Sequence, residues 1–391
     1  MRKTNWLVWV RGLFAAGLAI GVGAGGVLLG NCGPFTDVAA DVFCPFVLEI
    51  FYLGITTGTT ATTYDPASNV SRLQMAAFLS RTVDSTLKRG SRRTALDQFW
   101  TTQNATVLGM TTLPSGPLLA ASDGADLWVS SFGGVAFRIR GSDGRLLETW
   151  SGGGGDLYGI LPAIGRVFAV SATTPGKLLR IDPSQPAGAM SIVASNLGDT
   201  PGGLAFDGSR FWSANGGATG SVSIITPGAT IPWTVTTVTT GFQRPFGILY
   251  DGANIWVTDN TAGRLLKLDA GGAVLQTVTV GTSPNFPVFD GSNIWIPHSG
   301  SAFLSVVRAS SGAVIGTPSD NGINNSIAAA FDGQRILTTN LAGGTVSLWK
   351  AADLTALGFF PVGAANVPYG TCSDGIQFWV ALNNGSGLAR F

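Results

Sequence analysis

The sequence has little of the chemistry on which most catalytic and metal sites depend. Its 391 residues include one histidine, His298, and three cysteines. A metal site built from His and Cys ligands is therefore excluded, apart from a mixed site that also uses carboxylates. The chain also lacks a Gly-x-Ser-x-Gly elbow, an HExxH pattern, a phosphate-binding loop and an EF-hand loop. We expect no cofactor.

Charge is also scarce. Charged residues make up 12% of the chain and the formal net charge is +1, whereas about 25% is usual for soluble domains. Without a basic excess, nothing predicts a nucleic-acid partner. Glycine, in contrast, is abundant, with 55 residues. Together with many β-branched and aromatic residues, it predicts a large all-β body with many tight turns.

The cysteines are too few for a disulfide scaffold. Cys32 and Cys44 lie close enough in sequence to pair in an oxidising compartment. Cys372 would then be left over. It stands in the segment "YGTCSDG", and we expect a buried, inert thiol there.

The first 31 residues are typical of an export signal. Arg2 and Lys3 precede an apolar run that continues to Gly30, interrupted by Arg11. The alternative is a retained membrane anchor, since residues 12–30 are nearly long enough to span a bilayer. The segment "LLGNC" is similar to a lipoprotein box, but Asn31 stands where a small residue is needed, so we do not expect lipidation. Either alternative places the rest of the chain in the cell envelope, at the cell surface or in the periplasm.

Residues 35–84 have the pattern of a small helical module. The segment "CPFVLEIFYLG" is apolar and of helical length. A second helix is predicted from Ser71, because Ser71 and Gln74 form a capping-box pattern and apolar residues follow at helical spacing. The intervening segment, with Gly54, Gly58 and Pro66, predicts a loop. Residues 85–95, "STLKRGSRRTA", are predicted to be a solvated linker.

This module resembles an S-layer homology module. The resemblance is carried by Phe35 to Val38, Leu53 to Thr56, Gly58, Tyr64 to Pro66, and Val70 to Ala76. It implies a role in the cell envelope through non-covalent binding of a wall or surface polysaccharide. Arg72 is then a donor to an anionic glycan group, which suits a guanidinium; the alternative is an exposed arginine in the first turn of a helix.

A short phrase recurs along the remainder of the chain. It contains Asp-Gly and, five residues after the aspartate, tryptophan in most copies. The six clear copies are "SDGADLWVSS", "FDGSRFWSAN", "YDGANIWVTD", "FDGSNIWIPH", "FDGQRILTTN" and "SDGIQFWVAL", with aspartates at 123, 207, 251, 290, 332 and 374. The spacings are 84, 44, 39, 42 and 42 residues, and the degenerate copy "AIGRVFAVS", with Phe168 in the tryptophan place, fills the long one. Seven copies with a period near 42 predict a repeat architecture.

Each copy reads as four short antiparallel strands. A strand such as "FGILY" leads into the Asp-Gly turn, "IWVTD" follows, and two further strands complete the unit. Residues 96–391 therefore predict a seven-bladed β-propeller, so the fold class is mainly β. The last copy ends at Phe391 after three strands, and we expect its fourth strand to come from "FWTTQNATVLGM" (99–110), around Thr106 to Leu108. Such strand exchange would remove exposed sheet edges.

The repeats resemble YVTN-type and NHL-like propeller repeats, the group that also contains the streptogramin lyases. The resemblance is carried by "RPFGILYDGANIWVTDNTAGRLLKLD" (244–269) and "VPYGTCSDGIQFWVALNNGSGLARF" (367–391). The tryptophans at one repeat position are expected to pack between blades, with a carbohydrate-stacking row as the alternative. They are Trp128, Trp212, Trp256, Trp295 and Trp379. The Asp-Gly aspartates are expected to be turn residues on the face opposite any binding site.

A mostly polar series lies three residues after each tryptophan position. It comprises Ser131, Ser171, Asn215, Asp259, His298, Asn340 and Leu382. One interpretation is that these side chains bond their own loops. The other is a ligand-binding rim around the channel, with Arg244, Asp259, His298 and Asn340 as candidate ligand-binding residues.

Two functions remain open at this stage. The first is an exported envelope protein, with the module for attachment and the propeller as a binding scaffold for an unknown protein or small-molecule ligand. The alternative is a propeller enzyme, a lyase or lactonase, that uses His298 and a metal on the channel rim.

Overall fold

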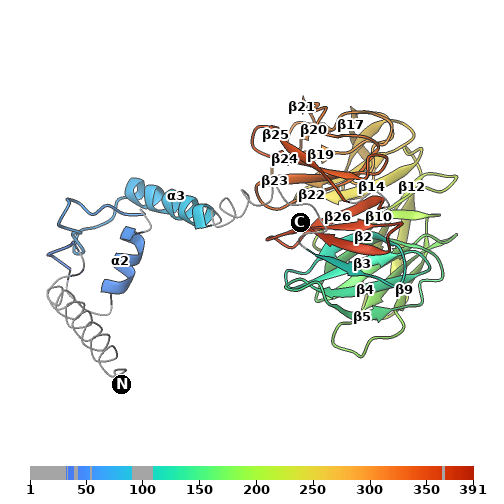
Figure 1. The fold of residues 1–391 in the computed structure, drawn as a ribbon, viewed down its shortest axis with the longest axis horizontal. Coiled ribbons are helices and arrows are strands. Elements are labelled where there is room, and N and C mark those ends of the chain that lie inside the picture. The colour runs from blue at the N-terminus through green and yellow to red at the C-terminus, as the bar shows by residue number, and fades with distance from the viewer. Residues whose placement is uncertain (1–31, 33, 39–42, 53–54, 90–108, 363–365) are drawn as a thin grey trace, which may run out of the picture. The chain divides into compact units, whose positions relative to one another are not determined.

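A computed structural model describes residues 32, 34–38, 43–52, 55–89, 109–362 and 366–391. The chain divides into two compact units, residues 1–97 and 98–391, and each is described by itself (Figure 1). Residues 1–31, which hold the expected export signal, lie outside the described residues.

The first unit contains two helices, α2 (Cys44–Tyr52) and α3 (Arg72–Arg89). The predicted capping box is confirmed: the Gln74 N–H donates to the Ser71 Oγ at 3.2 Å, and the Ser71 N–H donates to the Gln74 Oε1 at 2.8 Å. Helix α3 continues through residues 85–89, where the sequence predicted linker. No glycine or proline occurs in α3 before Gly90, so nothing in the backbone ends the helix earlier.

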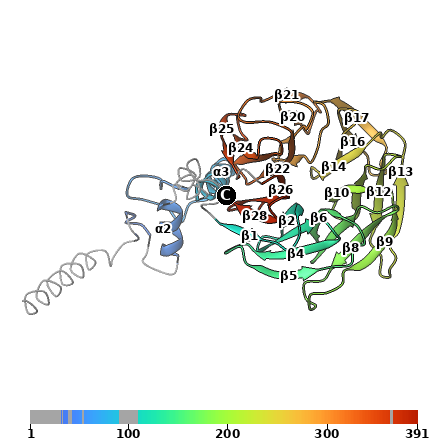
Figure 2. The ribbon, with the colours of Figure 1, turned by 45° about the vertical axis from the view of Figure 1, so that its right-hand side comes forward.

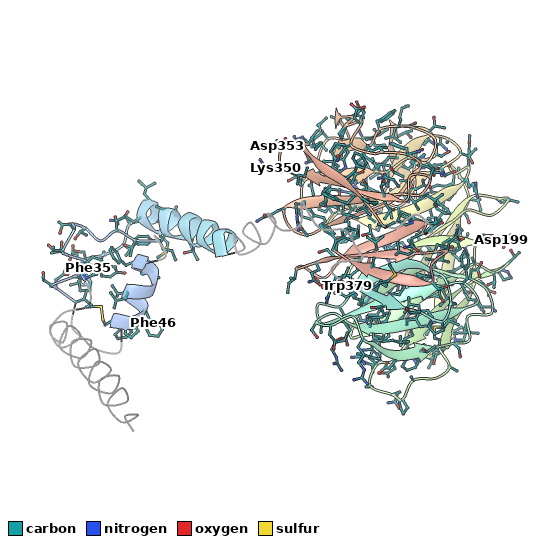
Figure 3. The ribbon with its side chains drawn as sticks, in the orientation of Figure 1. Phe35, Phe46, Asp199, Lys350, Asp353 and Trp379 are labelled. Carbon is teal, nitrogen blue, oxygen red and sulfur yellow. A yellow bond between two sulfur atoms is a disulfide. The ribbon has the colours of Figure 1, made fainter. Side chains whose placement is uncertain are left out.

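A disulfide and one aromatic residue organise this unit. Cys32 and Cys44 are joined by a disulfide, which Figure 3 shows as a yellow bond. Phe35 is fully buried, and its ring contacts those of Phe51 and Tyr64 at centroid distances of 5.1 and 5.5 Å. Because this core is small, the disulfide supplies much of its constraint. It also occupies the Cys32 sulfur, the atom that lipidation would modify.

The second unit is a seven-bladed propeller, as predicted. Each of its seven sheets has four strands. Blade 1 holds β2 (Pro117–Ser122), β3 (Asp126–Ser131), β4 (Val135–Arg140) and β5 (Leu146–Trp150). Blade 2 holds β6 (Leu157–Ala163), β7 (Arg166–Ser171), β8 (Gly176–Ile181) and β9 (Ser191–Leu197). Blade 3 holds β10 (Pro201–Phe206), β11 (Phe211–Asn215), β12 (Ser221–Thr226) and β13 (Thr234–Val238). Blade 4 holds β14 (Pro245–Tyr250), β15 (Ile255–Asp259), β16 (Arg264–Leu268) and β17 (Val274–Thr279).

The remaining blades complete the ring. Blade 5 holds β18 (Val288–Phe289), β19 (Asn293–Ile296), β20 (Ser305–Arg308) and β21 (Val314–Gly316). Blade 6 holds β22 (Ser326–Phe331), β23 (Arg335–Asn340), β24 (Thr345–Lys350) and β25 (Ala356–Pro361). Blade 7 holds β26 (Pro368–Ser373), β27 (Phe378–Leu382), β28 (Gly387–Arg390) and β1 (Met110–Thr112).

The two faces of the ring differ in their connections. The first strand of each blade lies nearest the ring centre, where Figure 2 shows β2, β6, β10, β14, β22 and β26. We call the face that carries the Asp-Gly turns the turn face. The opposite face, where first strands begin and second strands end, is the loop face. The Asp-Gly residues are turn residues on the face away from the polar series, as expected.

Ring closure by strand exchange is confirmed, but the strand lies later than expected. Strand β1 pairs antiparallel with β28, with Thr111 opposite Leu388. The residues expected to pair, 106–108, lie outside the described residues. Strand β1 completes blade 7 as its outermost strand, so blade 7 takes its four strands from both ends of the propeller sequence.

Each of the seven blade interfaces holds a hydrophobic cluster, and the repeated tryptophan position supplies one member of each. The tryptophans are Trp128, Trp212, Trp256, Trp295 and Trp379, and Phe168 and Leu337 take the place in blades 2 and 6. All seven side chains are at most 1% exposed. The expectation of packing between blades is confirmed, and each buried ring contributes roughly 2–3 kcal/mol.

The recurring phrase is explained by one aspartate carboxylate that makes three hydrogen bonds. In blade 4 the Asp251 Oδ1 accepts from the N–H groups of Ala253 and Asn254, and its Oδ2 accepts from the Trp256 indole N–H at 2.7 Å. The same indole bond occurs in blades 1, 3, 5 and 7, at 2.7–2.9 Å. The following glycine, Gly252, has φ +94°, which other residues rarely adopt. We call this arrangement the aspartate–indole clasp.

Two blades depart from the clasp. In blade 6, Asp332 bonds Arg335 instead, at 2.9 Å, and the Arg335 guanidinium lies over the Phe378 ring of blade 7. In blade 2, which lacks the aspartate, Ala163 pairs directly with Arg166 around a two-residue turn. Both departures keep the interface filled, with an aspartate–arginine pair in blade 6 and without any clasp in blade 2.

Ring closure is tested by two proline substitutions in β1. The Leu113 N–H donates to the Ser386 carbonyl, so by strand alternation the Thr111 N–H also faces β28 and the Thr112 N–H faces away. Thr111→Pro removes a closing bond, and we expect it to lower the free energy of unfolding by about 1–2 kcal/mol. Thr112→Pro, at an edge position that tolerates proline, should cost clearly less. Urea unfolding of the full chain measures both, and equal losses would contradict closure through β1.

The clasp is tested by a double-mutant cycle in blade 4. Asp251→Ala leaves the buried Trp256 indole N–H without its acceptor, and we expect a loss of about 2–3 kcal/mol. Trp256→Phe keeps a ring in the interface but removes the donor. The loss in the double variant should be smaller than the sum of the two single losses, by a coupling energy of at least about 0.5 kcal/mol. Strictly additive losses would show that the indole bond does not couple the two residues.

Candidate functional site

The first unit contains a cavity of about 400 Å³ between the loop and helix α3. Hydroxyl, phenol and amide groups supply most of its polar lining. The lining residues include Thr56, Thr57, Thr59, Tyr64, Asn69 and Gln74. Such groups donate and accept hydrogen bonds with neutral hydroxyls, so the cavity has the chemistry for a carbohydrate.

One carboxylate holds the loop that forms the cavity. Asp37 accepts from the backbone N–H groups of Tyr64 and Asp65, at distances down to 2.7 Å. These bonds, that from Tyr64 first, hold the pKa of Asp37 below its usual value. Phe35 therefore acts from the core of the module, and the exposed Asp37 acts through the loop that it holds.

Arg72 is the exposed first residue of α3, two residues before the cavity residue Gln74, and is not among the lining residues. The apolar side chains at helical spacing in α3 are not all buried. Leu73 is 84% exposed, and Ala77 and Phe78 are half-buried. The sequence did not single out the threonines and Asn69, because short polar residues in a loop look the same whether they line a cavity or face open solvent.

The polar series on the loop face is buried. Its seven members, Ser131, Ser171, Asn215, Asp259, His298, Asn340 and Leu382, are each 0% exposed. The polar members bond groups of their own blade or its connections: Ser171 donates to the Gly153 carbonyl, for example, and Asn215 donates to Ser221 and Ser223. These contacts support the interpretation that the side chains satisfy their loops.

Asp259 illustrates this role. Its carboxylate accepts from the backbone N–H groups of Gln243 and Arg244 at 2.9 and 2.8 Å. It also accepts from the Arg264 guanidinium at 2.9 Å. Asp259 therefore fixes the backbone of the exposed residue Arg244, and both are in blade 4.

Asn340 makes three side-chain hydrogen bonds within blade 6. It accepts from the Ser326 hydroxyl at 2.6 Å and donates to Thr345 and Ser347. Both ends of its amide are occupied, so the geometry gives it a structural task.

His298 is enclosed rather than set on the rim. Its Nε2 lies 2.9 Å from the Ser305 hydroxyl, its ring packs against Phe303, and its Nδ1 has no partner among the described residues. Burial lowers the pKa of His298 to about 4. The imidazole is therefore neutral at physiological pH. It does not reach solvent, whereas a metal-dependent reaction on the rim would require an accessible imidazole.

Four aromatic rings gather at the loop-face end of the channel, a feature that the sequence did not predict. They come from the starts of the innermost strands of blades 2, 4, 5 and 7: Tyr158, Phe246 and Tyr369 are the second residues of their strands, and Phe286 lies two residues before β18. Centroid distances are 6.3 Å for Tyr158–Phe246, 4.7 Å for Phe246–Phe286 and 6.4 Å for Phe286–Tyr369. We call these four residues the channel cluster. The only signal was the repeated Pro-aromatic-Gly start of some copies.

Other reactive groups are enclosed. Cys372 is buried, and burial raises the pKa of its thiol, in agreement with the expected inert cysteine. Over the described ranges, no three His, Cys, Asp or Glu side chains lie together as a metal site. No helix in those ranges is long and apolar enough to cross a membrane.

Comparison with known proteins identifies the first unit. Residues 34–76 match the S-layer homology domain, so the chain contains an S-layer homology domain followed by a seven-bladed propeller. Domains of this kind generally bind cell-wall polysaccharides, and this one implies a protein of the cell surface or envelope. No curated protein sequence matches the chain.

Solved structures share the propeller fold at low identity. A catalytically inactive virginiamycin B lyase from Staphylococcus aureus, solved with quinupristin, is 16% identical, with a TM-score of 0.60, 72% of this chain covered and 97% of the other. A streptogramin B lyase is 15% identical, with a TM-score of 0.60, 72% of this chain covered and 96% of the other. The hydrazine synthase of Kuenenia stuttgartiensis is 15% identical, with a TM-score of 0.61, 72% of this chain covered and 96% of the other. Since proteins with different activities are equally similar, the likeness shows the fold alone.

The burial of His298 predicts a pH-dependent loss of stability. Its pKa rises from about 4 in the folded chain to about 6.5 when unfolded, so the unfolded state binds the proton first as pH falls. The stabilising contribution is present above pH 6.5 and is lost as pH falls towards 4, by about 2 kcal/mol between pH 7.5 and pH 5. His298→Gln should flatten this part of the profile, measured by urea unfolding at the two pH values. An unchanged slope would contradict the assignment, because the chain has no other histidine.

Proposed function

We propose that this chain is an exported envelope protein. The S-layer homology domain attaches it to a wall or surface polysaccharide, and the propeller serves as a binding scaffold for a protein or small-molecule partner. The observation that carries the proposal is the match at residues 34–76, together with the hydroxyl-lined and amide-lined cavity in the same unit.

Two features support export. The first 31 residues have the basic start and apolar run of a signal. The Cys32–Cys44 disulfide suits an oxidising compartment outside the cytosol, and any cleavage must leave Cys32 in the mature chain for this disulfide to form.

The propeller supports binding more than catalysis. Of the candidate residues, Asp259, His298 and Asn340 are enclosed and committed to their own blades. Arg244 is exposed. A ligand on the loop face therefore meets Arg244 directly, and Asp259 holds the backbone of that residue.

Attachment is tested in the full chain by substitutions at the module. Arg72→Ala and Asn69→Ala should each weaken retention on purified wall polysaccharide. The Arg72 substitution removes a charge-assisted bond, so we expect the dissociation constant to rise about tenfold. Arg145→Gln, which removes an exposed charge from the propeller, is the control and should retain full binding. Circular dichroism checks that each variant is folded.

The outcome also assigns binding to one unit. Residues 98–391 form a separate compact unit and should not be retained on the polysaccharide. If the propeller alone were retained as strongly as the full chain, attachment through the module would be wrong.

A further inference from the structure

We propose that the loop-face end of the channel binds an acidic polypeptide segment of a partner protein. The segment would place an apolar side chain on the channel cluster and a carboxylate beside Arg244. This inference rests on the proposed function of the propeller as a binding scaffold, and it names the class of partner and the residues that contact it.

The first observation is the convergence of the rings. The channel cluster takes one ring each from blades 2, 4, 5 and 7, which are far apart in sequence. Tyr158, Phe246 and Tyr369 are only half-buried, whereas Phe286 is 8% exposed. A Cβ at position 202 of blade 3 would lie 3.3 Å from the Phe246 ring. Because this residue is glycine, the ring is not crowded there. Aromatic surface is therefore presented at the channel end.

The second observation is polar groups at the edge of these rings. The phenols of Tyr158 and Tyr369, on blades 2 and 7, influence one another's pKa. Burial raises the pKa of both phenols, the Asp156 carboxylate raises that of Tyr158 further, and the Arg244 guanidinium opposes the rise in both. Arg244 stands two residues before Phe246, and a Cβ placed on Gly216 would lie 3.6 Å from the Arg244 Cγ and 3.8 Å from the Phe246 ring, which places a positive charge beside the aromatic surface.

The third observation is that this charge lacks a counterion. In the described part of the chain, the Arg244 side chain makes no ion pair and no hydrogen bond, although its backbone is held by Asp259. The neighbouring Arg264, by contrast, bonds Asp259 at 2.9 Å. In a chain with 12% charged residues, an exposed guanidinium fixed at its backbone and free at its head fits a carboxylate ligand.

The fourth observation is backbone strain at the same repeat position. Arg244 directly precedes the innermost strand of its blade, and the equivalent residues of blades 3, 5 and 6 adopt left-handed conformations. They are Thr200, Ser283 and Asn325, with φ of 53°, 55° and 55°. Such conformations cost of order 1 kcal/mol or more for residues other than glycine. The folded ring maintains them, so the channel end is rigid before a ligand arrives.

The geometry favours a polypeptide over a glycan. The rings tilt onto one another at 40–66°, so they do not form one flat platform for a sugar ring, whereas ring edges and phenol hydroxyls suit an apolar side chain with a backbone beside it. The surrounding connections are rich in glycine, serine and asparagine, as in "SGGGGD" (151–156), "DNGINN" (320–325) and "NNGS" (383–386). Loops of this composition, with Tyr and Arg as anchors, are typical of protein-binding surfaces.

The experiment selects a displayed random-peptide library on the full chain. We expect enriched peptides to carry Asp or Glu within two positions of an aromatic or branched apolar residue. The best peptide is then synthesised in two forms, with its acidic residue intact and with that residue replaced by the corresponding amide. Both are titrated against the wild type, Arg244→Gln and the control Arg145→Gln, whose substitution removes a charge from the turn face. Polygalacturonate is titrated as the acidic-glycan probe.

The expected result is a thermodynamic cycle between peptide and protein. Replacing the peptide carboxylate should weaken binding about tenfold for the wild type and for Arg145→Gln, but by less than about twofold for Arg244→Gln. Tyr369→Phe, which keeps the ring, should weaken binding less than Arg244→Gln. Arg72→Ala should bind the peptide normally, so that failure here is distinguishable from failure of wall attachment.

Three results would overturn the proposal. They are the absence of enriched peptides, peptide binding that Arg244→Gln leaves unchanged, and binding of polygalacturonate but of no peptide in a manner that depends on Arg244. The last result would assign the channel end to an acidic glycan.

Discussion

The hydrogen bond from a buried indole to a turn aspartate is the interaction on which the propeller most depends. A blade must turn its chain tightly and also present a large apolar side chain to the next blade. One carboxylate does both, because its first oxygen caps the turn and its second holds the tryptophan in the interface. Asp207 shows how strongly such a carboxylate is held. Burial alone would raise its pKa, but the Trp212 indole and the backbone donors lower it to about 2.

This constraint divides the propeller into two faces with different freedom. On the turn face the clasp ties sequence to packing, so the same phrase returns in five of the seven blades with an arginine variant in a sixth. On the loop face the connections vary in length and composition, and buried polar residues such as Asn340 and Asp259 hold them in place. Variation is therefore tolerated on the face where the channel cluster and Arg244 lie. A repeat protein can acquire a binding site there without weakening its interfaces.

The sequence predicted the architecture well because the repeat is a physical unit. Period, turn chemistry and the missing last strand together determine seven blades and their closure. Strand β1 was placed a few residues too early, because several neighbouring residues in that segment satisfy the same strand pattern. Helix α3 was predicted too short, because a polar segment with basic residues reads as linker even though its first five residues, 85–89, include no glycine or proline.

The site was less predictable, for two reasons. Position in the repeat identified the ends of the second strands but not whether their side chains point into a blade or into solvent. The sequence therefore left both a rim and a loop-bonding role open for His298 and Asp259, which are enclosed. The channel cluster joins four blades through contacts across the ring, which no single repeat displays. Only Phe246 and Tyr369 share the Pro-aromatic-Gly start, so the convergence of all four is visible only in the folded ring.

The central claim is that attachment and recognition are separated between the two units. Hydrogen–deuterium exchange of the full chain, with and without purified wall polysaccharide, tests this most directly. The account predicts slower exchange in peptides that cover residues 55–78 and unchanged exchange throughout residues 109–391. Slower exchange in the propeller, with no change in the module, would contradict it.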